Sequence, residues 1–413
     1  MLVANTDGWY SMPQRHASLE RVKQAVPRAT SFKCGIVGAT CLCLGSSFAA
    51  TVPGAGTLPG SAATAAPFPL QLEMRVPFAP TAFPSLEHSY VAYELYLTNF
   101  SASAINLRRV EVLDANASAQ PPIVAFEGPE LEALLQPVGA HGPGGEAEPR
   151  RLGTGDTVIL FMWIPFERGA RIPDRLIHRV LTDDSTTEGT VVDTHHSGLH
   201  LLSPPLEGAG WKADDGPSND RDNHHRRGFF VLDGRSVISR RYAIDWEQVE
   251  RDSTYSGDEH DKRSYYSYGK PALAVADAMV VAARDGLPDN DPGHNETFHP
   301  AVPITMDTVV GNTVTLDLGG GQFAYYFHLQ SGSLRVKSGD HVRRGQVLAR
   351  VGSSGDAREP HLHFEVTTSA RALAGEGVPY LMSRYRVRTA DDTWQSRTRE
   401  LPLGGMLIDF GRE

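Results

Sequence analysis

The sequence predicts a mostly β protein with two domains. Its 413 residues exceed the usual length of one domain, and 40% are hydrophobic and 21% charged, which is ordinary globular composition. The 28 prolines and 40 glycines are spread along the chain between short apolar runs. Few long stretches carry apolar residues at helical spacing. Together these observations favour short strands joined by turns.

The net charge of −10 argues against nucleic acid as a partner, because phosphate contacts require clustered lysines and arginines. An acidic balance favours solubility, but it identifies neither a substrate nor an oligomeric state. A partner has to be inferred from individual motifs.

Residues 1–50 have the pattern of a secretory leader. Basic residues come before a short apolar stretch at 34–50, and small residues follow it. The stretch is shorter than the ~20 residues of a membrane-spanning helix, so no stable membrane span is expected in the mature chain. A buried core helix is the alternative. Cleavage after Ala50 or near Ala63 would give a secreted, periplasmic or cell-wall-associated protein without its three cysteines, which are Cys34, Cys41 and Cys43.

An immunoglobulin-like β-sandwich is predicted for residues 69–202. Short strand-like runs occur there, such as VAYELYL at 91–97 and TVILFMWI at 157–164, and Pro, Gly, Asn and Asp separate them. Residues 51–68 are mostly Ala, Gly, Pro and Thr and are interpreted as a linker before this domain. Residues 203–218 are interpreted as a second linker after it.

The strongest motif of the remaining domain, residues 219–413, is HLHFE at 361–365. Period-two spacing on a strand places His361 and His363 on the same face. Two imidazoles on one face can hold a metal ion and a reacting group together. Two solvated histidines on a strand are the alternative.

Further motifs precede this pair in a fixed order. They are YGKPALAVADAMV at 268–280, GNTVTLD at 311–317, YYFHL at 325–329 and VKSGDHVRRGQVLARVG at 336–352. With the final PHLHFE, this ordered set resembles the lysostaphin/LytM-like zinc metallopeptidases, which are peptidoglycan endopeptidases. Each motif alone is weak, whereas the set in this order is specific. The resemblance covers about 219–368.

The resemblance implies a small antiparallel β-barrel with an open groove. It also implies one Zn²⁺ held by two histidines and one aspartate, with water in the fourth position. Carried over to this sequence, Asp245 and His363 are zinc ligands, and His328 and His361 are catalytic residues. Glu365 shares the strand face of the histidines and could orient one of them. Strand-like segments after the family pattern are interpreted as an extension that flanks the barrel.

One ligand of the family pattern is missing. The family usually has a histidine four residues before the aspartate, but this sequence has Arg241, which stays protonated and cannot bind zinc. His225, with His224 as the alternative, is the nearest candidate replacement. A hairpin over 229–241 would bring the end that carries His225 beside the aspartate. The other interpretation is that both are surface histidines.

These features predict an exported zinc endopeptidase that hydrolyses peptide bonds of peptidoglycan cross-links. Zinc would lower the pKa of its bound water, and His328 and His361 would stabilise the oxyanion and carry the proton. The alternative, favoured by Arg241, is a metal-free LytM-like module that binds or regulates other cell-wall enzymes. Gly-rich proteins are an alternative substrate class. A biotinyl-type carrier domain would need a lysine displayed on a tight turn, and the sequence offers none.

Overall fold

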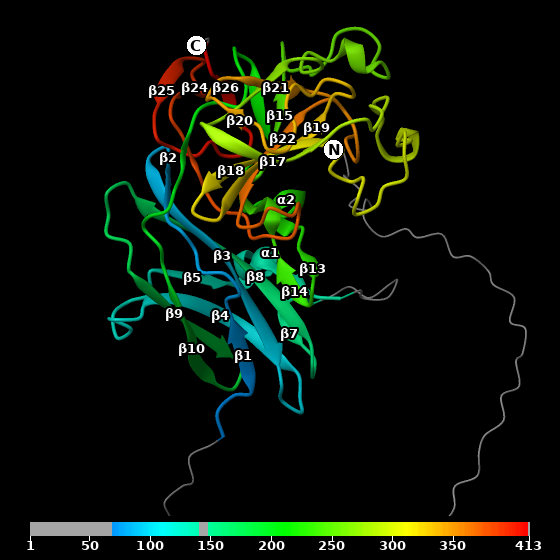
Figure 1. The fold of residues 1–413 in the computed structure, drawn as a ribbon. Coiled ribbons are helices and arrows are strands. Elements are labelled where there is room, and N and C mark those ends of the chain that lie inside the picture. The colour runs from blue at the N-terminus through cyan, green and yellow to red at the C-terminus, as the bar shows by residue number, and fades with distance from the viewer. Residues whose placement is uncertain (1–67, 140–147, 412–413) are drawn as a thin grey trace, which may run out of the picture. The chain divides into compact units, whose positions relative to one another are not determined.

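The computed structural model describes residues 68–139 and 148–411 (Figure 1). The predicted leader at 1–50, with its cysteines, lies outside these residues, as does nearly all of the predicted linker at 51–68. Residues Pro69–Glu413 form one compact unit. Strands dominate this unit, which confirms the mostly β prediction. In the described part, no helix is long and apolar enough to cross a membrane.

Two antiparallel five-stranded sheets form the N-terminal part (Figure 1). The first contains β1 (Leu72–Arg75), β3 (His88–Asn99), β8 (Thr157–Glu167) and β6 (Leu135–Pro137) in this order, with β2 (Phe83–Ser85) paired to β3. The second contains β10 (Thr186–Asp193), β9 (Arg175–Thr182), β4 (Ile105–Asp114) and β5 (Val124–Glu127), with β7 (Arg151–Leu152) paired to β4. Helix α1 (Gly128–Leu134) lies between β5 and β6 in the chain. Apolar side chains of both sheets share one core. The immunoglobulin-like type of this arrangement stays a prediction.

Strand β3 has both faces buried, which explains its continuous apolar sequence. Val91, Tyr93 and Leu95 belong to the core between the two sheets. Ala92 and Glu94 alternate with them on the opposite face, and Ala92 belongs to the core of the C-terminal part. Strand β3 therefore contributes side chains to the hydrophobic cores of both parts of the unit.

A buried histidine in the N-terminal core should make stability depend on pH. The Nδ1 of His178 donates to the Thr190 carbonyl, and its Nε2 accepts the Tyr93 hydroxyl proton, both at 2.8 Å. Burial lowers the pKa of His178 to about 4, against ~6.5 in an unfolded chain. Between these values the unfolded chain binds a proton that the folded chain does not. The free energy of unfolding should therefore fall as the pH drops below ~6.5, by up to about 3 kcal/mol near pH 4.

Urea unfolding at pH 7 and pH 4.5 measures this loss, with His178→Gln as the comparison because glutamine does not titrate. We expect the variant to lose less stability than the parent between these pH values. Equal pH dependence in the two proteins would contradict the assignment.

Ten antiparallel strands form the main sheet of the C-terminal part. Their order is β20 (His341–Val342), β17 (Ala278–Arg284), β18 (Asn312–Gly319), β19 (Gln322–Leu329), β22 (Leu362–Thr367), β15 (Ile244–Gln248), β12 (Trp211–Asp214), β26 (Leu407–Asp409), β24 (Tyr385–Arg388) and β25 (Trp394–Arg397). Among the described residues no pairing joins β20 to β25, so the sheet is open and the predicted small barrel is wrong. The C-terminal segment adds β26, β24 and β25 beyond β12, and these strands lengthen the sheet instead of closing it.

The prediction of a linker at 203–218 is also wrong, because this segment contains β12. Trp211 and Ala213 are fully buried in the C-terminal core, and β12 pairs with β15 on one side and β26 on the other. Gly- and Pro-containing flanks gave the segment its linker-like composition. The strand has too few residues for its alternation to stand out in the sequence.

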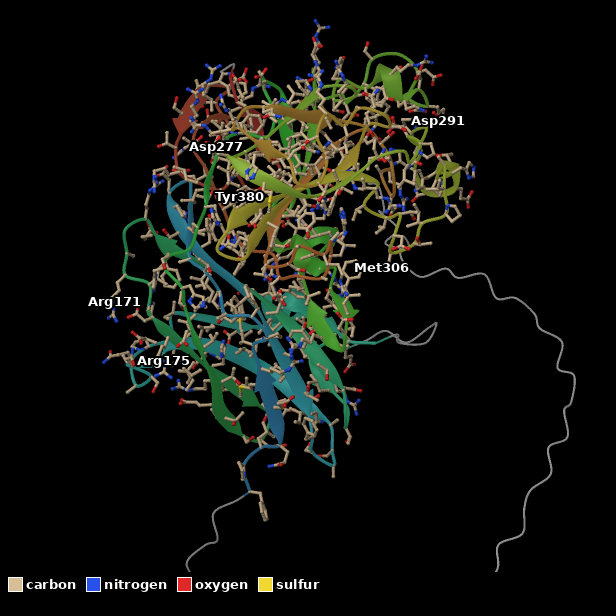
Figure 2. The ribbon with its side chains drawn as sticks, in the orientation of Figure 1. Arg171, Arg175, Asp277, Asp291, Met306 and Tyr380 are labelled. Atoms are coloured by element: carbon tan, nitrogen blue, oxygen red, sulfur yellow. The ribbon has the colours of Figure 1, made fainter. Side chains whose placement is uncertain are left out.

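Smaller elements complete the C-terminal part. They are the parallel pair β11 (Leu201–Leu202) and β23 (Leu381–Met382), the antiparallel pair β16 (Pro271–Leu273) and β21 (Val347–Arg350), the hairpin of β13 (Phe230–Leu232) and β14 (Arg235–Val237), helix α2 (His224–Arg227), and the 3₁₀ turns η1 (Ser239–Tyr242), η2 (Lys262–Ser264) and η3 (Asn295–Thr297). Figure 2 shows Tyr380 within the C-terminal part, where its ring lies 5.3 Å from that of Phe364 on β22. This packing fixes the core face of the strand that carries the histidines.

Candidate metal centre

Strands β15, β22 and β19 are neighbours and bring the predicted site residues together. On β22 the core side chains Leu362 and Phe364 alternate with His363, which faces the other side. Asp245 of β15 lies directly opposite His363 in the antiparallel register, and Phe327 of β19 lies opposite it on the other side. The rings of Phe327 and His363 stack at 5.1 Å. The register thus places the aspartate and the histidine on the face away from the core.

His225 approaches this face from helix α2. The helix begins after Asn223, whose side-chain carbonyl accepts the Arg226 amide as an N-cap. His225 is 2% exposed, and its Nδ1 donates to the Asp215 carbonyl at 2.9 Å. Because a carbonyl oxygen only accepts, the neutral ring carries its proton on Nδ1 and a lone pair on Nε2. That lone pair faces Asp245 Oδ2 at 3.4 Å.

Two hydrogen-bond acceptors therefore face each other in a buried place. Burial holds the pKa of His225 well below its usual value, so the ring is neutral. Burial alone would raise the pKa of Asp245, but the imidazoles of His225, His361 and His363 hold it well below its usual value. Within the described chain, His225 Nε2 has no hydrogen-bond partner. A lone pair against a carboxylate is unfavourable unless a cation lies between them, and metal ligands have this arrangement.

His363 contacts two carboxylates. Its Nδ1 lies 2.8 Å from Asp245 Oδ1, and its Nε2 lies 3.4 Å from Oε2 of the fully buried Glu365. Burial disfavours the charged ring, but Asp245 and Glu365 outweigh it and raise the pKa of His363 to about 9. A carboxylate on the outer nitrogen of a histidine ligand fixes the orientation of its ring. Glu365 is in position for this task.

Two separations around Asp245 are close to those of a tetrahedral zinc site, although among the described residues the group whose ligand atoms all lie within 4.8 Å of one another is His224, His225 and Asp245. Ligand bonds of ~2.0–2.1 Å at tetrahedral angles place neighbouring ligand atoms roughly 3.3 Å apart. Asp245 Oδ2 is 3.4 Å from His225 Nε2, and Asp245 Oδ1 is 2.8 Å from His363 Nδ1. Two imidazole nitrogens and one carboxylate oxygen also match the donors that zinc prefers. The donor types and the two separations around Asp245 therefore fit the ion.

His361 and His328 lie beside this group, with their rings 4.8 Å apart. The Nδ1 of His361 donates to the Glu359 carbonyl at 2.9 Å, and that of His328 donates to the Ser354 carbonyl at 2.8 Å. A neutral ring held in this way has its lone pair on Nε2. His361 Nε2 is 3.6 Å from Asp245 Oδ1. His328 has a φ of 61°, an uncommon conformation outside glycine that clusters at functional sites.

A protein-family model matches part of this region. Residues 264–374 match the model of peptidase family M23. The match confirms the resemblance predicted from the motifs. The M23 segment contains His328, His361 and His363, whereas His225 and Asp245 precede it.

Curated relatives of the M23 segment include two staphylococcal enzymes. Lysostaphin of Staphylococcus simulans is 36% identical over 76 residues, which are 18% of this chain and 15% of that protein. The glycyl-glycine endopeptidase ALE-1 of Staphylococcus capitis is 26% identical over 130 residues, which are 29% of this chain and 28% of that protein. The chain therefore spans less than a third of the length of either relative.

Solved M23 structures are similar to this chain only at low scores. The lysostaphin catalytic domain from Staphylococcus simulans has a TM-score of 0.21 at 21% identity, covering 35% of this chain and 77% of that domain. Pseudoalterin, an M23 metalloprotease from the deep sea, has a TM-score of 0.26 at 13% identity, covering 51% of this chain and 97% of that protein. These scores add nothing to the assignment of an activity.

The predicted hairpin before Asp245 is confirmed, but its role differs from the prediction. β13 and β14 pair around a turn at Asp233 and Gly234, which both have positive φ. His225 precedes the hairpin on α2 and is not on one of its strands. The helical turn, not strand pairing, carries its ring to Asp245.

His224, the alternative ligand, lies on the outer side of α2. It is exposed, and its Nδ1 is 2.9 Å from Asp215 Oδ2. Ligand atoms of His224, His225 and Asp245 lie within 4.8 Å of one another, so both histidines stay candidates. His225 is the stronger one, because its lone pair is buried and directed at Asp245.

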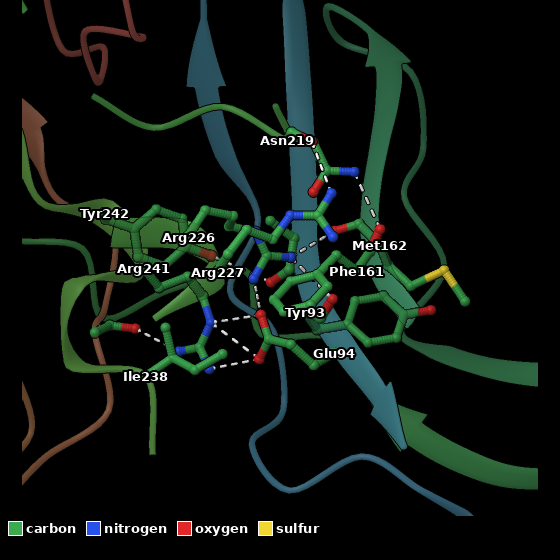
Figure 3. A network of polar contacts seen from close by, with 12 residues as sticks. Tyr93, Glu94, Phe161, Met162, Asn219, Arg226, Arg227, Ile238, Arg241 and Tyr242 are labelled. Atoms are coloured by element: carbon green, nitrogen blue, oxygen red, sulfur yellow. Dashed lines mark hydrogen bonds and ion pairs between the residues drawn. The ribbon is translucent and has the colours of Figure 1, made fainter. Parts of the chain in front are cut away.

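Arg241, which stands where the resemblance predicts a histidine ligand, contacts residues of other segments instead. Its guanidinium contacts Glu94 of β3 at 2.6 Å (Figure 3). It also contacts Glu376 at 2.8 Å and donates to the Gly377 carbonyl. Its side chain is 3% exposed. This position therefore serves a buried ion-pair network.

Sequence reasoning missed the residues that hold His225 in place. Asn223 before a run of four basic residues is an N-cap signal that could have indicated the helix. Glu94, a single acid within the apolar run at 91–97, was the available sign of a buried charge pair. No sequence pattern could have indicated the contact of His225 with the Asp215 carbonyl, because every residue has a backbone oxygen.

Proposed function

We propose that this chain is an exported zinc-dependent endopeptidase that hydrolyses peptide bonds in peptidoglycan cross-links. The M23 match supports a peptidase. The zinc proposal rests on one observation: His225 Nε2 is buried, has no hydrogen-bond partner among the described residues, and lies 3.4 Å from Asp245 Oδ2. The secretory pattern at 1–50 supports export, and the staphylococcal relatives support a cell-wall substrate.

In this proposal His225, Asp245 and His363 hold the zinc ion, and His224 is the alternative to His225. Zinc with three protein ligands keeps one position open, and when bound it polarises a carbonyl and acidifies a water molecule. Glu365 Oε2, 3.4 Å from His363 Nε2, would orient the ring of His363 in this proposal, and the Asp215 carbonyl accepts from Nδ1 of His225 and fixes that ring.

His328 and His361 carry the proton chemistry in the proposal. Burial, together with the imidazoles of His361 and His363, holds the pKa of His328 well below its usual value, so the ring is neutral. A neutral ring with its proton on Nδ1 can accept a proton at Nε2 from the attacking water and pass it to the leaving amine. In its protonated form His361 would carry a second proton on Nε2 and donate a hydrogen bond from it to the carbonyl oxygen as negative charge develops there.

Chelation tests this proposal directly. We expect the chain to release new amino groups from purified peptidoglycan, to lose this activity in a chelator, and to regain it when zinc is added. A pentaglycine peptide serves as a parallel substrate, because glycyl-glycine bonds are named as the substrate of one relative. If zinc-dependent cleavage occurs with the pentaglycine peptide but not with peptidoglycan, the proposed substrate would have to be changed to Gly-rich peptides. A chain that binds no zinc under zinc-replete conditions would contradict the proposal and leave the metal-free module.

A further inference from the structure

Helix α2 has two sides with different contacts. On one side His225 faces Asp245. On the other side Arg226 and Arg227 enter the N-terminal part, where both lie over the ring of Phe161 on β8 (Figure 3). The helix that carries the candidate ligand is therefore anchored in a different part of the unit from Asp245 and His363.

Arg226 forms the deepest of these contacts. It is fully buried and pairs through Nη1 with Glu94 of β3. Its Nη2 donates to the carbonyls of Tyr93 at 3.1 Å and Met162 at 3.0 Å. Glu94 and Tyr93 lie on β3 and Met162 lies on the neighbouring strand β8. Arg226 is the immediate neighbour of His225.

Glu94 also holds the segment that leads to the aspartate. Its carboxylate accepts from Arg241 Nε at 3.1 Å and from Arg241 Nη2 at 2.6 Å. Arg241 lies in η1, four residues before Asp245 on β15. One carboxylate of β3 thus connects the two segments that carry His225 and Asp245, and it does so where water is excluded.

We propose that Glu94 is a positioning residue of the metal centre, so that the N-terminal sheets set the metal affinity of the C-terminal part. This inference rests on the proposed function. Moving a ligand nitrogen relative to its partner oxygen weakens metal binding, and loss of such supporting contacts typically costs about 10–100-fold in affinity. This inference also gives Arg241 a role. Arg241 is not a ligand itself, but its ion pair with Glu94 helps to position His225, the replacement ligand.

Glu94→Gln tests this role, because glutamine keeps the shape but cannot balance two arginines. The matched control is Glu111→Gln. Glu111 is also buried in the N-terminal part and pairs with two arginines, Arg109 and Arg179, but it lies on β4 of the other sheet. Zinc Kd is measured by competition with a chromophoric chelator, and the ligand geometry by the visible spectrum of the cobalt-substituted protein.

We expect Glu94→Gln to raise the zinc Kd by about 10–100-fold and to alter the cobalt spectrum, while Glu111→Gln matches the parent in both. A parent-like Kd and spectrum in folded Glu94→Gln would overturn the inference and leave the proposed function intact. Equal weakening in Glu111→Gln would also overturn it, since the effect would then follow general stability. A parent that binds no zinc would remove the proposed function and this inference together.

If Glu94→Gln does not fold, Arg226→Lys decides the question by the same measurements. Lysine keeps the positive charge but cannot reach the carboxylate and both carbonyls at once. A zinc Kd at least about 10-fold higher than that of the parent would support the inference. An unchanged Kd would overturn it.

Discussion

Replacing His225 by alanine is expected to reduce bound zinc from about one ion per chain to almost none, and to abolish hydrolysis. The variant removes the ligand candidate whose buried lone pair lies 3.4 Å from Asp245 Oδ2. His224→Ala is the matched control, because it removes an imidazole from the next position of the same short helix. Elemental analysis of both purified variants measures the outcome.

The control also separates the two assignments of the ligand. Zinc kept in His224→Ala and lost in His225→Ala is the expected result. The reverse pattern would move the ligand by one residue and keep the enzyme. Full zinc content in both variants would show that neither histidine is needed, and this would contradict the assignment.

Replacing His328 or His361 by alanine is expected to leave the zinc content unchanged and to lower kcat by roughly 10²–10⁴-fold, the usual contribution of a positioned acid or base. Neither ring belongs to the three proposed ligands, and each is fixed by a bond from Nδ1 to a backbone carbonyl. Zinc analysis and peptidoglycan hydrolysis on the same preparations separate catalysis from metal binding. His341→Ala, at an exposed histidine of the same part, is the control.

A loss of zinc in His361→Ala would show that this ring is a ligand, since its Nε2 lies 3.6 Å from Asp245 Oδ1. Parent-like kcat in either variant would exclude that residue from the proton chemistry. Either result would change the division of roles without affecting the M23 match.

The parts of the fold that sequence predicted best are those with strong local signals. The runs at 91–97 and 157–164 lie within β3 and β8, and the Asp–Gly turn closes the predicted hairpin. Period-two alternation sets His363 on the opposite face of β22 from Leu362 and Phe364, because strand geometry alone fixes which side chains share a face. These predictions depend on neighbours in the sequence.

The parts that failed depend on contacts between distant segments. Whether a sheet closes is decided by which strand lies at each edge, and β12, β26, β24 and β25 occupy one side here. Glu94 meets Arg226 and Arg241 across more than 130 residues of chain. No local pattern encodes such a meeting, so the anchoring of α2 emerges only from the fold.

The central claim is that α2 supplies a metal ligand in place of the usual M23 histidine. Crystals of the zinc-loaded chain, with an anomalous difference map at the zinc edge, test it most directly. We predict one peak about 2.0–2.2 Å from His225 Nε2, an Asp245 oxygen and His363 Nδ1. A peak bound without any residue of α2, or no peak at Asp245, would contradict the claim.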